Sequence, residues 1–311
     1  MASATITRRH ESFDVICAGE PLWRAARDRR GFAAADAGLL NVTKMLARAR
    51  VRVGLATVLE DDRLGRTSLA AIAAMGLDVG GVKLASPVAH LVVVDAAGGQ
   101  SGVLSDAAAG AAELEIPLLH ISTDYVFDGV APRDAEGRPR PYVESDPTDP
   151  CSVYGQTKLE GERAVLAASP RHTVVRTAWL YGVDGRNFVD TMLRLAEERE
   201  AVQVVDDQIG SPTWSGHLAP AVLGLLERQV QGLVHLTGSG RVSWNGFARE
   251  IFRQAEVSCR VESATSEQMA RPAPRPAWSA LESERDDILP MPSWEDGLAG
   301  YLAARNGMMR P

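Results

Sequence analysis

The chain alternates short apolar segments with segments of helical character, and this alternation restricts the folds it can adopt. Apolar runs lie at 13–18, 51–59 and 116–127, and the stretch 36–50 between the first two is typical of a helix. A strand that is apolar throughout is buried on both faces, and strands that alternate with helices pair in a parallel sheet. We therefore predict an α/β protein with a Rossmann-like parallel sheet that carries helices on both faces.

The same pattern continues to the C-terminus. Further strands are predicted at 89–99, 173–182, 201–207 and 233–238, and further helices at 65–75, 157–168 and 187–199. The composition changes at 105–112, where small residues dominate (SDAAAGAA). We place a boundary there, with an N-terminal segment at 1–108 and a second segment at 109–311. Both are parallel α/β pieces, so we expect their strands to pair in one sheet.

Charge and cysteine content narrow the function. A formal net charge of −7 over 311 residues argues against binding to nucleic acid or to an anionic membrane, because both require a surplus of Lys and Arg on one face. A small soluble substrate is predicted instead. Cys17, Cys151 and Cys259 are far apart and odd in number, so we expect neither a disulfide framework nor a cysteine metal site. The sequence shows no secretory signal and no stretch of membrane-spanning length, which favours a cytoplasmic location.

Four side chains form the most specific reactive set. Ser122 and Thr123 end an apolar run, and Tyr154 and Lys158 are four residues apart at the start of a predicted helix. Side chains at the carboxyl end of a parallel strand face the crevice in which α/β proteins bind ligands. Residues four apart on a helix share a face, so Tyr154 and Lys158 are expected within reach of each other. A lone YxxxK motif is commonly a surface helix turn, and the functional interpretation depends on the neighbouring STDY and RTAW motifs.

The tyrosine and lysine have complementary chemistry. A phenol with a pKa near ~10 exchanges protons poorly at neutral pH, and an adjacent ammonium stabilises the phenolate and lowers that pKa. Tyr154 could then give a proton to a carbonyl oxygen as a hydride reaches the carbonyl carbon. The hydroxyl of Thr123 would hold the same oxygen, and Lys158 would also bind the ribose hydroxyls of a nicotinamide cofactor.

Residues 109–311 resemble the extended short-chain dehydrogenase/reductases, whose Ser/Thr, Tyr and Lys triad these residues match. Within that group, the dTDP-4-dehydrorhamnose reductase family has similar blocks in the same order: HISTDYVFDG, YGQTKLEGE, VVRTAWLYG, VVDDQIGSPTW, HLTGSGRVSWNGFA and RPAPRPAWSAL. The resemblance implies reduction of the 4-keto group of a nucleotide-linked deoxysugar with NADPH or NADH, in dTDP-L-rhamnose biosynthesis. It also implies a smaller C-terminal substrate-binding part.

The resemblance assigns roles to individual residues. Thr123, Tyr154 and Lys158 would be catalytic, and Ser122 would join the last two in binding the cofactor. The substrate would be contacted by Asp124, Tyr125, Trp179, Arg271 and Arg275, the two arginines pairing with its phosphate oxygens. The structural alternatives are a core aromatic for the tryptophan and solvated loop charges for the arginines. No metal site is predicted, and Mg²⁺ is not indicated by the sequence. The expected partners are a nucleotide-sugar substrate and, in a homodimer, a second copy of the chain.

The first hundred residues differ from that family. The sequence after 13–18 continues GEPLW, which lacks the glycine-rich turn that holds the pyrophosphate of a dinucleotide. Residues 12–106 resemble instead the N-terminal part of ribokinase-like sugar kinases, with Glu20 at the acidic residue of the opening strand and Asn41 at the sugar-binding asparagine. The later GAGD-type segment of those kinases, which supplies the anion hole and catalytic base, does not occur downstream. We therefore predict a ribokinase-like segment joined to a reductase-like remainder.

Three functions follow from these observations. The first is the reductase activity, which rests on Thr123, Tyr154 and Lys158. The second is a non-catalytic nucleotide-sugar-binding or regulatory protein, which the missing glycine-rich turn favours. The third is a carbohydrate kinase-like protein, which the N-terminal segment favours and the missing phosphate-transfer segment opposes.

Overall fold

The computed structural model describes residues 117–183, 187–269 and 273–308, the strands at 15–18, 53–56 and 90–94, and short stretches at 105, 108–109 and 111–113. The expected helices at 36–50 and 65–75 lie outside the described residues, as do Glu20 and Asn41.

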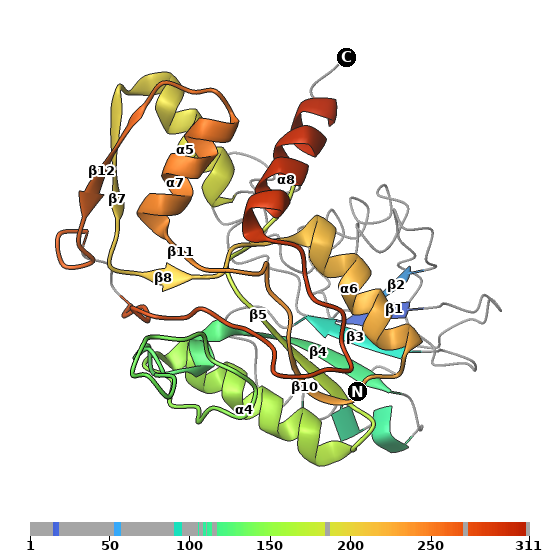
Figure 1. Ribbon diagram of the computed structural model, residues 1–311. Helices are drawn as coiled ribbons and strands as arrows, with labels where there is room; N and C mark the ends of the chain where they lie inside the picture. The colour runs from blue at the N-terminus through green and yellow to red at the C-terminus, as the bar shows by residue number, and fades with distance from the viewer. Residues whose placement is uncertain are drawn as a thin grey trace, which may run out of the picture.

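A parallel sheet runs through the molecule (Figure 1). In the described part of the chain its strand order is β10-β5-β4-β3-β1-β2. The strands are β1 (Val15–Ala18), β2 (Val53–Ala56), β3 (His90–Val94), β4 (Leu118–Thr123), β5 (Thr173–Thr177) and β10 (Gly232–His235). All neighbouring strands pair in parallel, and β3 joins the N-terminal strands to β4. The expectation that both segments contribute to one sheet is therefore confirmed.

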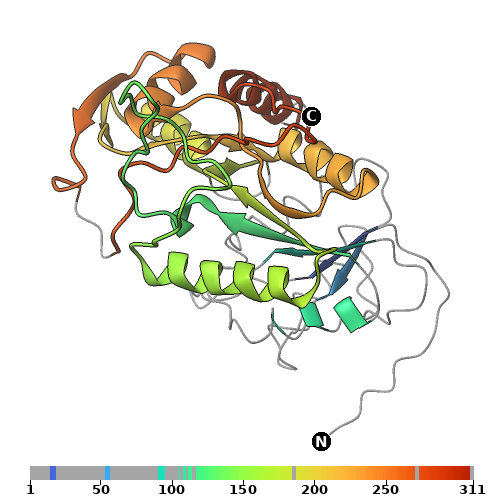
Figure 2. The same cartoon turned by 60° about the horizontal axis from the view of Figure 1, so that its bottom comes forward.

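Helices cover both faces of the sheet, as predicted. Helix α4 (Val153–Ala168) lies on one face and α6 (Ser215–Glu227) on the other (Figures 1 and 2). Successive side chains of a strand point to opposite faces. Leu119 and Ile121 of β4 accordingly pack with the apolar side chains of α6, whereas Ser122 contacts α4. This alternation gives the sheet one apolar face and one face with charged and polar side chains.

A second, smaller unit packs beyond the sheet (Figure 1). It contains helices α5 (Phe188–Glu198), α7 (Trp244–Gln254) and α8 (Trp294–Met308) and the parallel strand pair β7 (Ala201–Val205) and β12 (Arg260–Ala264). Its core is aliphatic and aromatic and includes Phe247, Leu298 and Tyr301. The helix expected at 187–199 and the strand expected at 201–207 are thereby confirmed.

The strand predicted at 173–182 divides in two. β5 ends at Thr177, and the two-residue strand β6 (Leu180–Tyr181) pairs with β9 (Thr213–Trp214) in a different sheet. Trp179 lies between them with a φ of 45°, a left-handed conformation that interrupts an extended strand. The break redirects the chain from the central sheet to the smaller unit.

Residues 277–284, called the strap here, tie the two parts together near the end of the chain. On one side, the strap pairs with Ile209 of β8 (Ile209–Gly210), which itself pairs with β11 (Val242–Ser243). On the other side, Tyr142 N donates to Ala280 O at 2.8 Å, and Tyr142 O accepts from Glu282 N at 2.9 Å.

Among the residues described, no helix combines the length and the apolar character needed to cross a bilayer.

Candidate active site

The carboxyl end of β4 turns directly into the short 3₁₀ helix η2 (Asp124–Val126). Thr123 is extended and caps η2, because its Oγ1 accepts from Tyr125 N at 3.2 Å and lies 3.1 Å from Asp124 Oδ1. Such a cap satisfies a backbone N–H that has no partner within the helix. Thr123 and Asp124 are both buried. The cap fixes the predicted substrate-contacting residues at the end of the strand.

Helix α4 begins against η2. Ser152 caps it by accepting from Gly155 N at 3.1 Å, so the helix starts at Val153 rather than at the expected residue 157. A Cβ at Gly155 would lie 2.1 Å from Tyr125 O, so only glycine permits this approach. The approach places the ring of Tyr154 edge-on to the ring of Tyr125, with centroids 5.7 Å apart. The motif glycine after Tyr154 thus brings the phenol to the end of β4.

Lys158 is one turn further along α4 and is buried. Its Nζ donates to Ile121 O at 3.0 Å and lies 3.5 Å from Nε2 of His120. A buried ammonium requires such oxygen and nitrogen partners to offset its desolvation. The structure therefore gathers Thr123, Tyr154 and Lys158 around the last residues of β4.

Beyond Lys158, a buried ion pair joins α4 to the sheet. The Arg176 Nη2 and Glu162 Oε2 atoms are 2.7 Å apart, and Arg176 Nε lies 2.9 Å from Glu162 Oε1. Ser122 Oγ donates to the same Oε1 at 2.5 Å. The Ser122 hydroxyl thus contacts Glu162, and its predicted contact with a cofactor stays a prediction.

His235 of β10 extends this network. Its Nδ1 lies 3.0 Å from Glu282 O and 3.2 Å from Tyr142 O, and these carbonyls can only accept, so Nδ1 carries the proton. Nε2 then accepts from Arg176 Nη1 at 3.4 Å. Burial, reinforced by the guanidinium, lowers the pKa of His235, although Glu144 acts in the opposite direction. The imidazole is therefore a neutral link between the ion pair and the strap.

The carboxyl group of Asp124 is the most perturbed acid at the end of β4. Burial raises its pKa to about 6, and hydrogen bonds from Ser279 and Thr123 offset part of that effect. Its Oδ2 atom is buried and has no hydrogen-bond partner among the described residues. Ser279 belongs to the strap, so the strap reaches the same place as Thr123.

Trp179 connects the sheet to the smaller unit. Its indole stacks on Trp244 with centroids 3.6 Å apart and planes at 5°. A Cβ at Gly210 would lie 2.3 Å from the Trp179 ring, so this glycine provides the space beneath it. Trp179 is partly exposed and also packs against the buried cluster of Phe127 and Leu281. The structure thus places the predicted substrate-lining tryptophan on a rigid aromatic stack.

Of the two predicted arginines, only Arg275 belongs to the described residues, and no contact described there joins it to this constellation. Arg275 is exposed, and Arg271 lies outside the described residues. Sequence reasoning also missed three residues of the site: Glu162, His235 and Ser279. Glu162 carried a usable signal, since it follows Lys158 by four residues and so shares its helix face. His235 and Ser279 lie in the blocks HLTGSGRVSWNGFA and RPAPRPAWSAL, but their spacing does not relate them to Arg176 and Asp124, because only tertiary packing brings these residues near each other.

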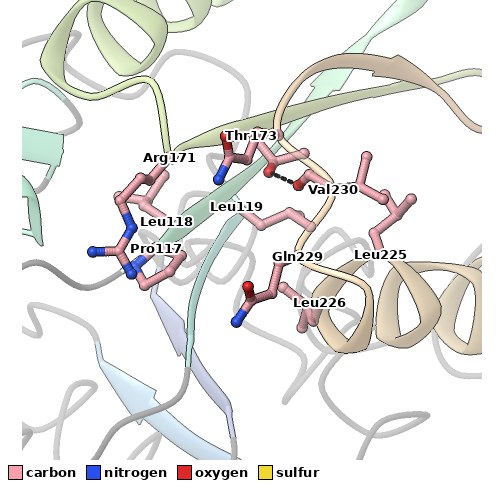
Figure 3. Close-up of a pocket in the computed structure, with 10 residues that line it drawn as sticks. Pro117, Leu118, Leu119, Arg171, Thr173, Leu225, Leu226, Gln229 and Val230 are labelled. Carbon is pink, nitrogen blue, oxygen red and sulfur yellow. Dashed lines mark hydrogen bonds between the residues drawn. The ribbon is translucent and has the colours of Figure 1, made fainter. Parts of the chain in front are cut away.

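A small cavity lies at the amino ends of β4 and β5, away from the end of β4 at which Thr123 lies (Figure 3). It is lined by residues at the start of β4 and β5 and the end of α6, including Leu119, Thr173 and Leu226, and Thr173 Oγ1 donates to Val230 O at 2.7 Å there. Its volume of about 30 Å³ has room for a water molecule or two, not for a sugar nucleotide. Open α/β sheets bind ligands beyond the carboxyl ends of their strands, so this cavity is not the candidate site.

The fold and the site together define a class of protein. Tyr154 and Lys158, one helical turn apart on α4, contact Tyr125 and Ile121 at the end of a central strand of a doubly wound sheet, the end at which Thr123 lies. That set can donate a proton to a carbonyl oxygen, which is the chemistry of a carbonyl reductase of the short-chain type.

The family follows from sequence comparison: residues 98–306 match the family described as RmlD substrate binding domain, and the chain belongs to it. A dTDP-4-dehydrorhamnose reductase of Sinorhizobium fredii is 42% identical over 207 residues, 62% of this chain and 67% of that protein. One of Mycobacterium tuberculosis is 44% identical over 234 residues, 73% of each chain. A solved dTDP-4-dehydrorhamnose reductase of Bacillus anthracis in complex with NADP has a TM-score of 0.70 at 26% identity and covers 94% of this chain and 100% of its own.

These matches confirm the Rossmann-like fold and the reductase resemblance. They do not support the ribokinase-like resemblance of residues 12–106, since the solved reductase superposes on most of the chain. The family match starts at residue 98, upstream of the boundary predicted after 108.

Proposed function

We propose that this chain reduces the 4-keto group of a dTDP-linked 6-deoxysugar with NADPH, as a dTDP-4-dehydrorhamnose reductase. The observation that carries the proposal is the placement of Tyr154 and Lys158 on α4 beside Thr123 at the end of β4. The names of the relatives and the NADP in the Bacillus anthracis structure support the same substrate class and cofactor.

In this mechanism the chain's residues manage the proton. The Thr123 and Tyr154 hydroxyls hold the keto oxygen, and Tyr154 donates its proton to that oxygen as the carbonyl carbon is reduced. The Lys158 ammonium, held by Ile121 O, stabilises the phenolate that forms. The Thr123 hydroxyl donates to Asp124 Oδ1 in this structure, so it would turn from that carboxylate to the keto oxygen when the sugar binds.

The residues described fit the nicotinamide-ribose end of the cofactor. The donor set suits ribose hydroxyls, since a phenol and an ammonium face the end of β4 one helical turn apart. When bound, the reduced nicotinamide supplies the hydride. The pyrophosphate end would fall on the residues after β1, which lie outside the described part and whose sequence GEPLW has no glycine-rich turn.

Replacement of the phenol tests the proposal. NADPH oxidation is followed by absorbance with dTDP-4-dehydrorhamnose for the wild type and for Tyr154→Phe. Loss of a positioned proton donor lowers kcat by ~10²- to 10⁴-fold. Tyr181→Phe is the matched control, because it removes a buried hydroxyl that has no hydrogen-bond partner in the described part of the chain, and it should retain wild-type kcat. Wild-type protein without turnover, or turnover unchanged in Tyr154→Phe, contradicts the proposal.

The missing glycine-rich turn favours a second candidate, a protein that binds the sugar nucleotide without turning it over. Calorimetric titration separates the two. Tight NADPH binding supports the reductase, whereas binding of dTDP-sugar without NADPH binding supports the second candidate.

Several finer assignments are part of the proposal and stay predictions. They are substrate contacts from Asp124, Tyr125, Trp179, Arg271 and Arg275, a cytoplasmic location, a homodimer, and a ribokinase-like origin of residues 12–106.

A further inference from the structure

We propose that Glu162 and Arg176 form a positioning pair that fixes the rotation of α4 and so sets the placement of Tyr154 and Lys158. This inference deepens the proposed reductase function and rests on it. Neither residue is assigned a role by that mechanism, and both are almost completely buried.

The strands present a row of polar side chains beneath α4. Ser122 of β4 and Arg176 of β5 are register partners, and Arg176 is in turn the register partner of His235 on β10. Register partners in a parallel sheet point to the same face. Glu162 lies against this row and accepts from both Ser122 and Arg176, so a single carboxylate of the helix contacts two strands.

The interior face of α4 has little apolar surface with which to hold its orientation. Its buried residues include two glycines, Gly155 and Gly161, and two charged residues, Lys158 and Glu162, beside Leu159 and Val165. Apolar packing has no direction, whereas a guanidinium and a carboxylate make two nearly parallel bonds that fix both partners. The rotation of α4 therefore depends more on its polar contacts than that of a helix with a wide apolar stripe.

The spacing along α4 transmits this constraint to the reacting groups. Tyr154, Lys158 and Glu162 follow one another at intervals of four residues, which places them on one face. Gly155 contacts η2 and Lys158 contacts Ile121 O, so Glu162 is the third fixed point along the helix. Two fixed points leave the helix free to rotate about the line that joins them, and a third point off that line removes this rotation.

The row also connects the pair to the strap. Glu144 Oε1 accepts from His235 N at 2.7 Å and from Ser283 Oγ at 2.5 Å, and Glu144 Oε2 accepts from Glu284 N at 2.9 Å. Arg176 donates to Glu162 of α4 on one side and to Nε2 of His235 of β10 on the other. The positioning pair is braced by the same segment that brings Ser279 to Asp124.

The test uses a neutral double variant, Glu162→Gln together with Arg176→Gln, because it leaves no unpaired buried charge. We expect it to fold, with kcat reduced by about 10- to 100-fold and KM for the sugar nucleotide within about twofold. Hydrogen exchange of the α4 amides should accelerate at least about tenfold in the full-length protein. The control is the exposed pair Arg194 and Glu198 on α5. Changing both to glutamine should leave kcat, KM and the hydrogen exchange of the α4 amides at wild-type values.

Arg176→Lys provides a second route if the double variant fails to fold. It keeps the charge and loses the two-pronged contact, so kcat should fall by about 2- to 10-fold relative to the wild type. Wild-type kcat and wild-type α4 exchange in either folded variant overturns the inference. If the wild type itself lacks turnover, the proposed function fails, and hydrogen exchange still decides whether the pair orders α4.

Discussion

The interface under α4 and the core of the smaller unit are packed by opposite means. Under α4, the buried side chains include Lys158, Glu162 and Arg176, and each meets a named polar partner. In the smaller unit, α5, α7 and α8 meet through side chains such as Phe247 and Leu298. One region is held by directional contacts and the other by apolar area.

The difference shows which region tolerates change. An apolar core accepts substitutions that conserve volume, because its contacts have no direction. A buried ion pair does not tolerate a substitution that removes one of its two charges, because the remaining charge keeps its desolvation cost. The proposed reacting groups lie in the region with directional contacts, where side-chain positions are defined most tightly and repacking can compensate least for a substitution.

The largest expected effect comes from Arg176→Met, which conserves approximate length and removes the charge. The Glu162 carboxylate would then be buried with Ser122 as its one strong donor among the contacts described, and the free energy of unfolding should fall by about 3 to 5 kcal/mol. Urea denaturation followed by circular dichroism measures it. Glu198→Gln, in the exposed pair on α5, should change stability by less than about 0.5 kcal/mol. A loss below about 1 kcal/mol in Arg176→Met would mean that the two regions do not differ.

Asp124→Asn should stabilise the protein, with a pH dependence of defined sign. The folded-state pKa of about 6 exceeds the ordinary aspartate value of 3.8, so the folded state binds more protons between these values and wild-type stability falls as pH rises through this window. The asparagine cannot ionise, so its advantage should be small near pH ~4 and reach about 2 to 3 kcal/mol at pH ~8. Urea midpoints of both proteins at several pH values provide the measurement. If the stability gain of Asp124→Asn does not grow with pH, burial does not raise the pKa of the Asp124 carboxyl.

The smallest effect is expected in the apolar region. Leu298→Met changes a completely buried side chain of the α8 face to one of similar volume and should cost less than about 1.5 kcal/mol. Thermal unfolding of this variant beside Arg176→Met gives the comparison directly. A loss as large as that of Arg176→Met would show that the smaller unit also depends on specific contacts.

Sequence reasoning could place the proposed reacting set because its placement depends on local rules. The four-residue spacing of Tyr154 and Lys158 places them on one helix face, and the apolar run before Thr123 places this residue at the end of a strand. All three could therefore be placed without coordinates. The break at Trp179 could not be anticipated, since a left-handed φ in a non-glycine residue is imposed by its surroundings. His235 and the strap escaped prediction for a related reason: their contacts join residues 47 and 93 positions apart.

The contact between Gly155 and η2 has a consequence for anyone who builds chimaeras from relatives of this chain. Because the α4 backbone rests on the Tyr125 carbonyl with no space for a β-carbon, the two segments have complementary surfaces at the level of the main chain. A transplanted α4 will therefore need glycine at the position of Gly155 to pack against η2. The crossover points that preserve this unit lie before β4 and after α4, and cuts in the loop between them divide it.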